Sequence, residues 1–204
     1  MVPAVVVGTD AAPSKMVWWR YTPGICTTGG AGTFDKLGPT NQYVIDTAGG
    51  SSATGNAVTL DSSGNILIAG QSGFGMALWR FVPTTTGSPD TTFGSPNGYV
   101  TYTPPQGTGA SGAAIAYANS GNKIIVAGSS TKSLPAGATV WRFSNTGAAD
   151  TTFGSNGIFF QDATQTSSTD NGNALVLDSS GNILLGGYSS VSSVKSAAVW
   201  RVAP

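Results

Sequence analysis

The chain has 204 residues, a formal net charge of zero and only 9% charged residues. Nucleic-acid binding relies on concentrated Lys and Arg, so this charge balance argues against a nucleic-acid partner. Every acid is Asp, and the sequence contains neither Glu nor His, which excludes Ser-His-Asp catalysis and the common His-containing metal sites. No apolar run approaches the length of a membrane span, so membrane insertion is not expected.

A tryptophan-arginine pair recurs along the chain with an interval of about 60 residues. Such a period, with short apolar runs in each unit, is typical of propellers and related all-β arrays. The four pairs are Trp19-Arg20, Trp79-Arg80, Trp141-Arg142 and Trp200-Arg201. We therefore predict a single repeat domain over residues 1–204, with units at about 1–54, 55–112, 113–171 and 172–204, of which the first and last are partial.

Short apolar runs predict the strands of each unit, while 29 Gly and the absence of Glu predict almost no helix. The first unit offers runs at 4–8, 17–21 and 43–47, and the second at 56–61, 66–70, 76–81 and 99–103. The third offers 114–118, 124–128, 139–143 and 158–162, and the fourth 174–178, 183–187 and 198–202. The predicted fold class is all-β, a propeller-like array of four-stranded blades whose first and last blades are truncated.

The first two strands of a full unit are joined by a tight turn, Asp61-Ser62-Ser63-Gly64 in the second unit and Asp178-Ser179-Ser180-Gly181 in the fourth. The Asp side chain can accept backbone hydrogen bonds and the Gly can take a positive φ, which predicts hairpins. Each turn carries one carboxylate, too few for Ca²⁺. We expect no metal and no cofactor.

Longer motifs recur as well: LDSSGNILIAG at 60–70, LDSSGNILLGG at 177–187, and DTTFG at 90–94 and 150–154. With these motifs the chain resembles the delta-sixty repeat family of large bacterial and some archaeal surface or secreted proteins. The resemblance covers nearly the whole chain and implies a propeller-like fold, but it carries no activity. The first unit departs from the pattern, because Ala31 stands where DTTFG begins with Asp.

The repeated arginines need partners, because a buried unpaired charge is costly. Asp90 follows Arg80 closely and Asp150 follows Arg142, so we predict two structural clamps, Arg80 with Asp90 and Arg142 with Asp150. The repeated tryptophans are expected to pack between blades. The alternative is a ring of exposed indoles that stack on sugars.

The sequence offers few residue types that could carry out catalysis. No Asp stands out from the repeat as a tuned acid-base residue, so we predict no catalytic residues and no enzyme. Cys26 is the only cysteine, so an intrachain disulfide is excluded. A buried thiol and an intermolecular disulfide both stay open for it.

The predicted function is that of an extracellular or cell-surface structural protein that self-associates through its incomplete end blades into an oligomer or filament. Open sheet edges pair with other chains unless they are blunted. The candidate interface is Trp200, Arg201 and Val202 at one end with Val5, Val6 and Val7 at the other. No acid follows Arg201, so a neighbouring subunit is expected to supply its partner. The alternatives are a carbohydrate-binding propeller with glycan partners and a fragment of a longer array; ring, filament and monomer stay open.

Overall fold

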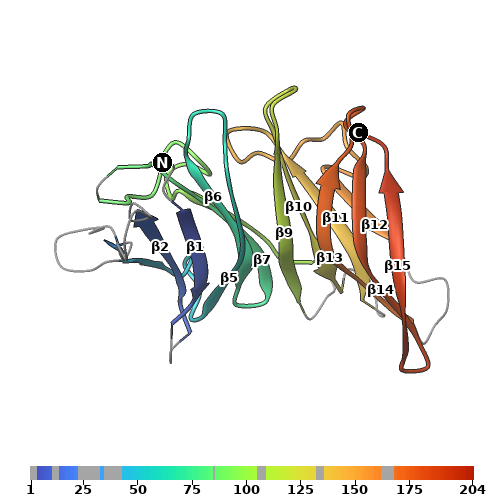
Figure 1. Ribbon diagram of the computed structural model, residues 1–204. Helices are drawn as coiled ribbons and strands as arrows, with labels where there is room; N and C mark the ends of the chain where they lie inside the picture. The colour runs from blue at the N-terminus through green and yellow to red at the C-terminus, as the bar shows by residue number, and fades with distance from the viewer. Residues whose placement is uncertain are drawn as a thin grey trace, which may run out of the picture.

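The computed structural model describes residues 4–10, 14–22, 33–34, 43–84, 86–104, 109–131, 136–161 and 168–204, and within these ranges it is all-β, with no helix. The strands form four antiparallel sheets of three or four strands, each made from one stretch of the chain. The sheets lie side by side in chain order, with the first at one end of the molecule and the last at the other (Figure 1). We number them sheet 1 to sheet 4.

The strands occur where the apolar runs predict them, with β3 as an addition. Sheet 1 contains β1 (Ala4–Thr9), β2 (Met16–Thr22), β3 (Thr33–Phe34) and β4 (Tyr43–Asp46). Sheet 2 contains β5 (Ala53–Leu60), β6 (Ile66–Ser72), β7 (Gly75–Phe81) and β8 (Tyr99–Tyr102). Sheet 3 contains β9 (Ala110–Ala118), β10 (Lys123–Ser130), β11 (Gly137–Phe143) and β12 (Ile158–Gln161). Sheet 4 contains β13 (Ser168–Leu177), β14 (Ile183–Val191) and β15 (Val194–Val202).

Sheets 1 and 4 differ from the two complete sheets in the strands that they hold. In sheet 2 the order is β5-β6-β7-β8, and β1 and β2 match β6 and β7 in sequence and pairing. Among the described residues, sheet 1 therefore has no strand equivalent to β5, and sheet 4 has none equivalent to β8. These are the two positions that the sequence predicts to be empty.

The inner sheets are apolar on both faces, because each is covered by a sheet on either side. On β6, Ile68 packs with Trp79 in a core shared with sheet 1, whereas Leu67 packs with Leu78 in a core shared with sheet 3. We call the side of a sheet that faces the next sheet in the chain its forward face, and the other its backward face. Burying one such side chain stabilises a fold by about 1.5–3 kcal/mol, so these interfaces dominate the stability of the array.

Sheets 2, 3 and 4 each carry a β-bulge in their first strand, opposite a glycine of the second strand. In sheet 4 the register shifts between Gly172 and Ala174, and Gly187 lies opposite. A Cβ on Gly187 would overlap the carbonyl oxygen of Asn171, so only glycine fits this close approach. Gly70 and Gly128 hold the same position in their sheets.

The bulge gives a matched pair of adjacent substitutions. We expect Gly187→Ala to lower the free energy of unfolding by about 2 kcal/mol, because the new methyl group meets backbone that cannot move freely. Gly186→Ala is the control, since a Cβ there has no heavy atom within 4 Å. Chemical denaturation measures both, and equal stability of the two variants would contradict the close approach.

Candidate functional site

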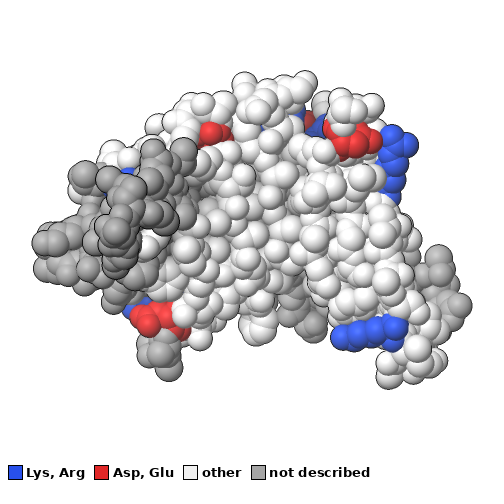
Figure 2. All heavy atoms as spheres, viewed as in Figure 1, with Lys and Arg blue, Asp and Glu red and all other residues white. Residues whose placement is uncertain are grey.

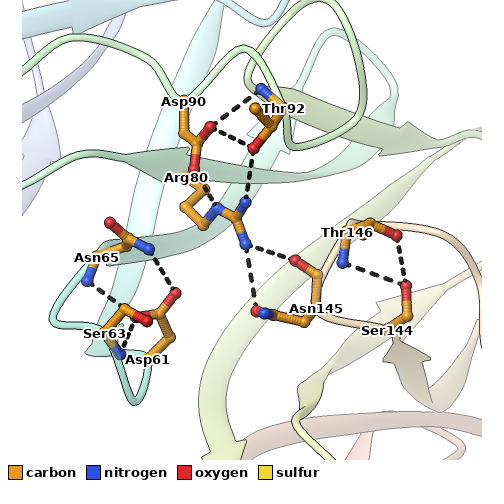
Figure 3. Close-up of polar contacts among 9 residues, drawn as sticks. All are labelled: Asp61, Ser63, Asn65, Arg80, Asp90, Thr92, Ser144, Asn145 and Thr146. Carbon is orange, nitrogen blue, oxygen red and sulfur yellow. Dashed lines mark hydrogen bonds and ion pairs between the residues drawn. The ribbon is translucent and has the colours of Figure 1, made fainter.

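The arginine of sheet 2 lies in a closed polar cluster on β7 (Figure 3). Arg80 Nε donates to Asp90 Oδ2 at 2.9 Å, and Nη2 donates to Thr92 Oγ1 at 3.2 Å. The guanidinium carbon lies 4.8 Å from the ring centroid of Phe93, which adds a cation-π contact. The DTTFG segment therefore supplies a carboxylate, a hydroxyl and a ring to one buried cation.

The loop forms this cluster because its own residues hold the carboxylate in place. The backbone N–H of Thr92 donates to Asp90 Oδ1 at 3.0 Å, and the Thr92 hydroxyl donates to the same oxygen at 2.6 Å. Asp at the first position of such a turn accepts hydrogen bonds from the residue two positions later. One carboxylate oxygen is thus used by the loop, and the other receives the arginine.

Sheet 3 repeats the cluster and adds a second cation. Arg142 Nε donates to Asp150 Oδ2 at 2.8 Å, and Arg142 lies over the ring of Phe153 at 4.5 Å. Lys123, on β10, places its Nζ 2.9 Å from the same carboxylate oxygen. The structure thus brings together both pairs that the sequence predicts, and it adds Lys123, which the sequence did not single out.

Two of the arginines also reach across to the following sheet. Arg80 Nη1 donates to the backbone oxygen of Asn145, in the loop after β11, and lies 3.2 Å from the Asn145 side-chain oxygen (Figure 3). Arg20 Nη1 donates to the backbone oxygen of Pro83 at 3.4 Å. Each of these bonds joins one sheet to the loop that follows the arginine strand of the next. We call this contact an inter-sheet arginine bond.

The surroundings hold the pKa of both loop carboxyls below the usual range of aspartate. For Asp150 the hydrogen bond from Lys123 has the largest effect, the bonds from Thr152 and the charge of Arg142 add to it, and burial opposes them. For Asp90 burial is the largest single effect and raises the pKa, but Thr92 and Arg80 together outweigh it. Both groups are therefore held ionised, as expected of structural ion pairs and not of a group that exchanges protons near neutral pH.

The hairpin carboxylates are occupied by their own turns. Asp178 Oδ1 accepts the backbone N–H of Ser180 at 2.9 Å and that of Asn182 at 2.8 Å. The Asn182 side chain also donates to it, and these bonds lower the pKa of Asp178 to about 2. Asp61 makes the same contacts with Ser63 and Asn65 in sheet 2. Among the described residues, no three His, Cys, Asp or Glu side chains gather as a metal site would require.

The repeated tryptophans of the inner sheets lie inside the array. Trp79 and Trp141 are buried, so neither presents a ring for stacking on a sugar. Trp79 Nε1 donates to Asp46 Oδ1 at 3.0 Å, a bond from sheet 2 to sheet 1. Tyr102 stands at the equivalent of Asp46 in sheet 2, and its ring lies 5.9 Å from that of Trp141. Packing between sheets is thus the role of these two indoles.

A cavity of about 540 Å³ opens between sheets 2 and 3. Tyr102, Trp141 and Phe143 line it together with Asn156, and no charged side chain is part of its lining. Burial raises the pKa of Tyr102. The cavity offers apolar surface, hydroxyl groups and an amide, but no acid-base pair that could carry out general acid-base catalysis.

The forward face of sheet 4 is an apolar sheet face with an open position that is fully buried in the other three sheets. Trp18, Leu78 and Val140 hold this position in sheets 1 to 3 and are all 0% exposed, whereas Val199 is 78% exposed. Val176, on the neighbouring strand β13, is also exposed on this face. In the inner interfaces the position is covered by the following sheet.

The predicted interface residues divide between the two faces of their strands. Val202 is buried, and Trp200 packs against the same core with sheet 3, so neither side chain points outward. In sheet 1, Val5 and Val7 pack toward sheet 2, and Val6 is exposed. Alternation along each strand explains the division, since neighbouring residues point to opposite faces.

Arg201 has a partner that the sequence prediction missed. Its Nη2 lies 3.1 Å from Asp178 Oδ2, in the turn between β13 and β14, and its side chain is 63% exposed. The expectation that a neighbouring subunit must supply the carboxylate partner of Arg201 is therefore wrong, because Asp178 of the same chain supplies it. The signal was present, because the hairpin pairing places the start of β14 beside the end of β15, where Leu184 pairs with Arg201. Cys26 lies outside the described residues.

Within the part of the chain that the structure describes, no helix is long and apolar enough to cross a bilayer. Neither a protein-family model nor a curated protein matches this sequence.

The clamp of sheet 3 gives a stability prediction. We expect Asp150→Ala to lower the free energy of unfolding by about 3 kcal/mol, because it leaves the largely buried Arg142 without a carboxylate. Arg201→Ala is the control, since it removes only the exposed ion pair with Asp178, which should contribute less. Denaturant titration measures both variants. A parent-like midpoint for Asp150→Ala would show that the clamp does not stabilise the fold.

The clamps also predict how stability depends on pH. The pKa of Asp150 is lower in the folded chain than the unfolded value of about 3.9, so its contribution is complete above that value and is lost as the pH falls below it. We expect the melting temperature of the parent to decrease between about pH 4 and pH 2, and Asp150→Asn to decrease less steeply. Thermal melts across this range measure the difference, and parallel curves would contradict the assignment.

Proposed function

We propose that this chain is a non-enzymatic structural repeat protein that acts outside the cell or at its surface and self-associates through its two end sheets. Its sheets are interpreted as the blades of a propeller-like array. In support, consecutive sheets contact one another through β1 and β5, β5 and β9, and β9 and β13. We interpret these strands as the inner strands around the axis of a propeller.

The exposed forward face of sheet 4 carries the proposal. The molecule itself shows how such a face is covered, because the matching faces of sheets 1, 2 and 3 are each buried against another sheet. The expected occupant is a sheet with the same chemistry as the sheets of this chain. A second copy of the chain provides one, and the contact then continues an interface that the fold already contains.

The edge of the last sheet supports association as well. Among the described residues no strand pairs with the outer side of β15, so its backbone groups there lack sheet partners. Natural proteins protect such edges with charges, prolines or bulges. Lys195 and Arg201 are the only charged residues on β15, and the strand contains no proline.

The composition of the surface favours a structural role over catalysis. The face shown in Figure 2 is almost free of charge, with isolated Lys, Arg and Asp side chains. Several Asp carboxylates serve in clamps and turns, as described above. A low-charge surface rich in Ser, Thr and Gly also fits a protein at the cell surface.

Two valines of β15 test the proposal as a matched pair. Val199 lies on the forward face of sheet 4, whereas Val194, which is 68% exposed, lies at the hairpin tip and points to the other side of the strand. We expect the parent to form larger species as its concentration rises in sedimentation experiments. Val199→Lys should remain monomeric, because a charge cannot be buried in an apolar contact without a partner.

Val194→Lys should associate as the parent does, which controls for the added charge. A parent that stays monomeric at every concentration would overturn the proposal. If that monomer is retained on glycan columns, a carbohydrate-binding role takes its place.

A further inference from the structure

The three interfaces inside the molecule share one register. The apolar position on the forward face of one sheet lies in the same core as a fixed position on the second strand of the next. These pairs are Trp18 with Ile68, Leu78 with Val126, and Val140 with Leu185. Val199 is the equivalent in sheet 4 of Trp18, Leu78 and Val140. Val6 is the equivalent in sheet 1 of Ile68 and Val126.

The two inter-sheet arginine bonds also join equivalent positions of consecutive sheets. The acceptor of Arg20 is Pro83, three residues after Arg80, and the acceptor of Arg80 is Asn145, three residues after Arg142. Arg20 and Arg80 thus each bind the loop that follows the arginine strand of the next sheet, whereas Arg142 bonds only Asp150 and Thr152 of its own sheet among the described residues. Arg201 occupies this arginine position in the last sheet.

The guanidinium of Arg201 is oriented toward solvent with donors to spare. Asp178 receives Nη2, but no acceptor among the described residues is bonded to Nη1, the nitrogen with which Arg20 and Arg80 reach the next sheet. The open apolar position at Val199 therefore points to a missing neighbour, and the unbonded Nη1 of Arg201 lies on the same face of sheet 4.

We infer that the forward face of sheet 4 binds the backward face of sheet 1 of a second copy, in the register of the internal interfaces. Val199 then packs on Val6 of the second copy. The unbonded Nη1 of Arg201 lies at this contact and donates to an acceptor of the second copy. The inference rests on the proposed function and names the partner surface for it.

The two faces that meet are different, so the contact is heterologous. The forward face of sheet 4 carries Leu184 and Val199 beside Arg201. The backward face of sheet 1 carries Val6 and Ile45, both exposed, and Val17, which is buried. A heterologous contact leaves one face of each kind free in every dimer. Association then continues until a ring closes or a filament grows.

Cross-linking of cysteine variants tests which surfaces meet. In a Cys26→Ser background, Val199→Cys and Val6→Cys are prepared separately and treated with a short bifunctional maleimide, alone and mixed. We expect efficient cross-linking only in the mixture. Cross-linking of Val199→Cys alone would indicate a symmetric contact and overturn the inference, as would a mixture that associates by sedimentation without cross-linking.

Arg201 is tested by removing its charge and keeping its length. Arg201→Met should weaken association roughly tenfold, the scale of one charge-assisted hydrogen bond. Lys195→Met is the control for charge, because it removes one positive charge from the same face of β15 at its hairpin end, away from Arg201, where Lys195 contacts the ring of Tyr188. The melting temperature of each monomer verifies folding.

The outcomes separate the two levels of the proposal. If the parent associates and Arg201→Met matches it, the arginine bond is wrong and self-association stands. If Lys195→Met weakens association as strongly as Arg201→Met, charge alone matters and the register is wrong. If the parent does not associate at all, the proposed function fails first.

Discussion

Burial of apolar side chains between consecutive sheets is the interaction on which the rest of this structure depends. A sheet of three or four short strands has too little core of its own and needs a neighbour on at least one face. Sheets 2 and 3 have a neighbour on both faces, which is why residues 66–70 of β6 are continuously apolar instead of alternating. The order of the units in the chain is then also their order in space.

This arrangement restricts where the few charges of the chain can lie. An arginine on a strand between two sheets is stable only if its guanidinium is bonded on every side. For Arg80 the DTTFG loop supplies a carboxylate, a threonine hydroxyl and a phenylalanine ring, and sheet 3 supplies a backbone oxygen. The same residue therefore holds its own loop in place and fixes the position of the neighbouring sheet.

The sequence predicts the strands well, because period, apolar runs and turn chemistry are local features. It also identifies the clamps, since Asp90 and Asp150 lie in the loop directly after their arginines. It does not show which side of β15 is covered, so it predicts Trp200 and Val202 as interface residues, whereas Val199 is the exposed residue. The backbone acceptors at Pro83 and Asn145 leave no signal, because every residue has a carbonyl group. The partner of Arg201 lies upstream, in the preceding hairpin turn, whereas Asp90 and Asp150 lie downstream of their arginines.

The linear order of the sheets has a consequence for how the molecule opens. Sheets 2 and 3 are supported from both sides, whereas sheets 1 and 4 each have a described neighbour on one side only. In a one-dimensional stack, stability is close to a sum of unit and nearest-neighbour contributions. Local unfolding therefore begins at the end sheets and costs less free energy there than in the middle. A neighbour bound to sheet 4 would convert that end into an interior position. Local unfolding of sheet 4 would then cost more free energy than it does in the single chain.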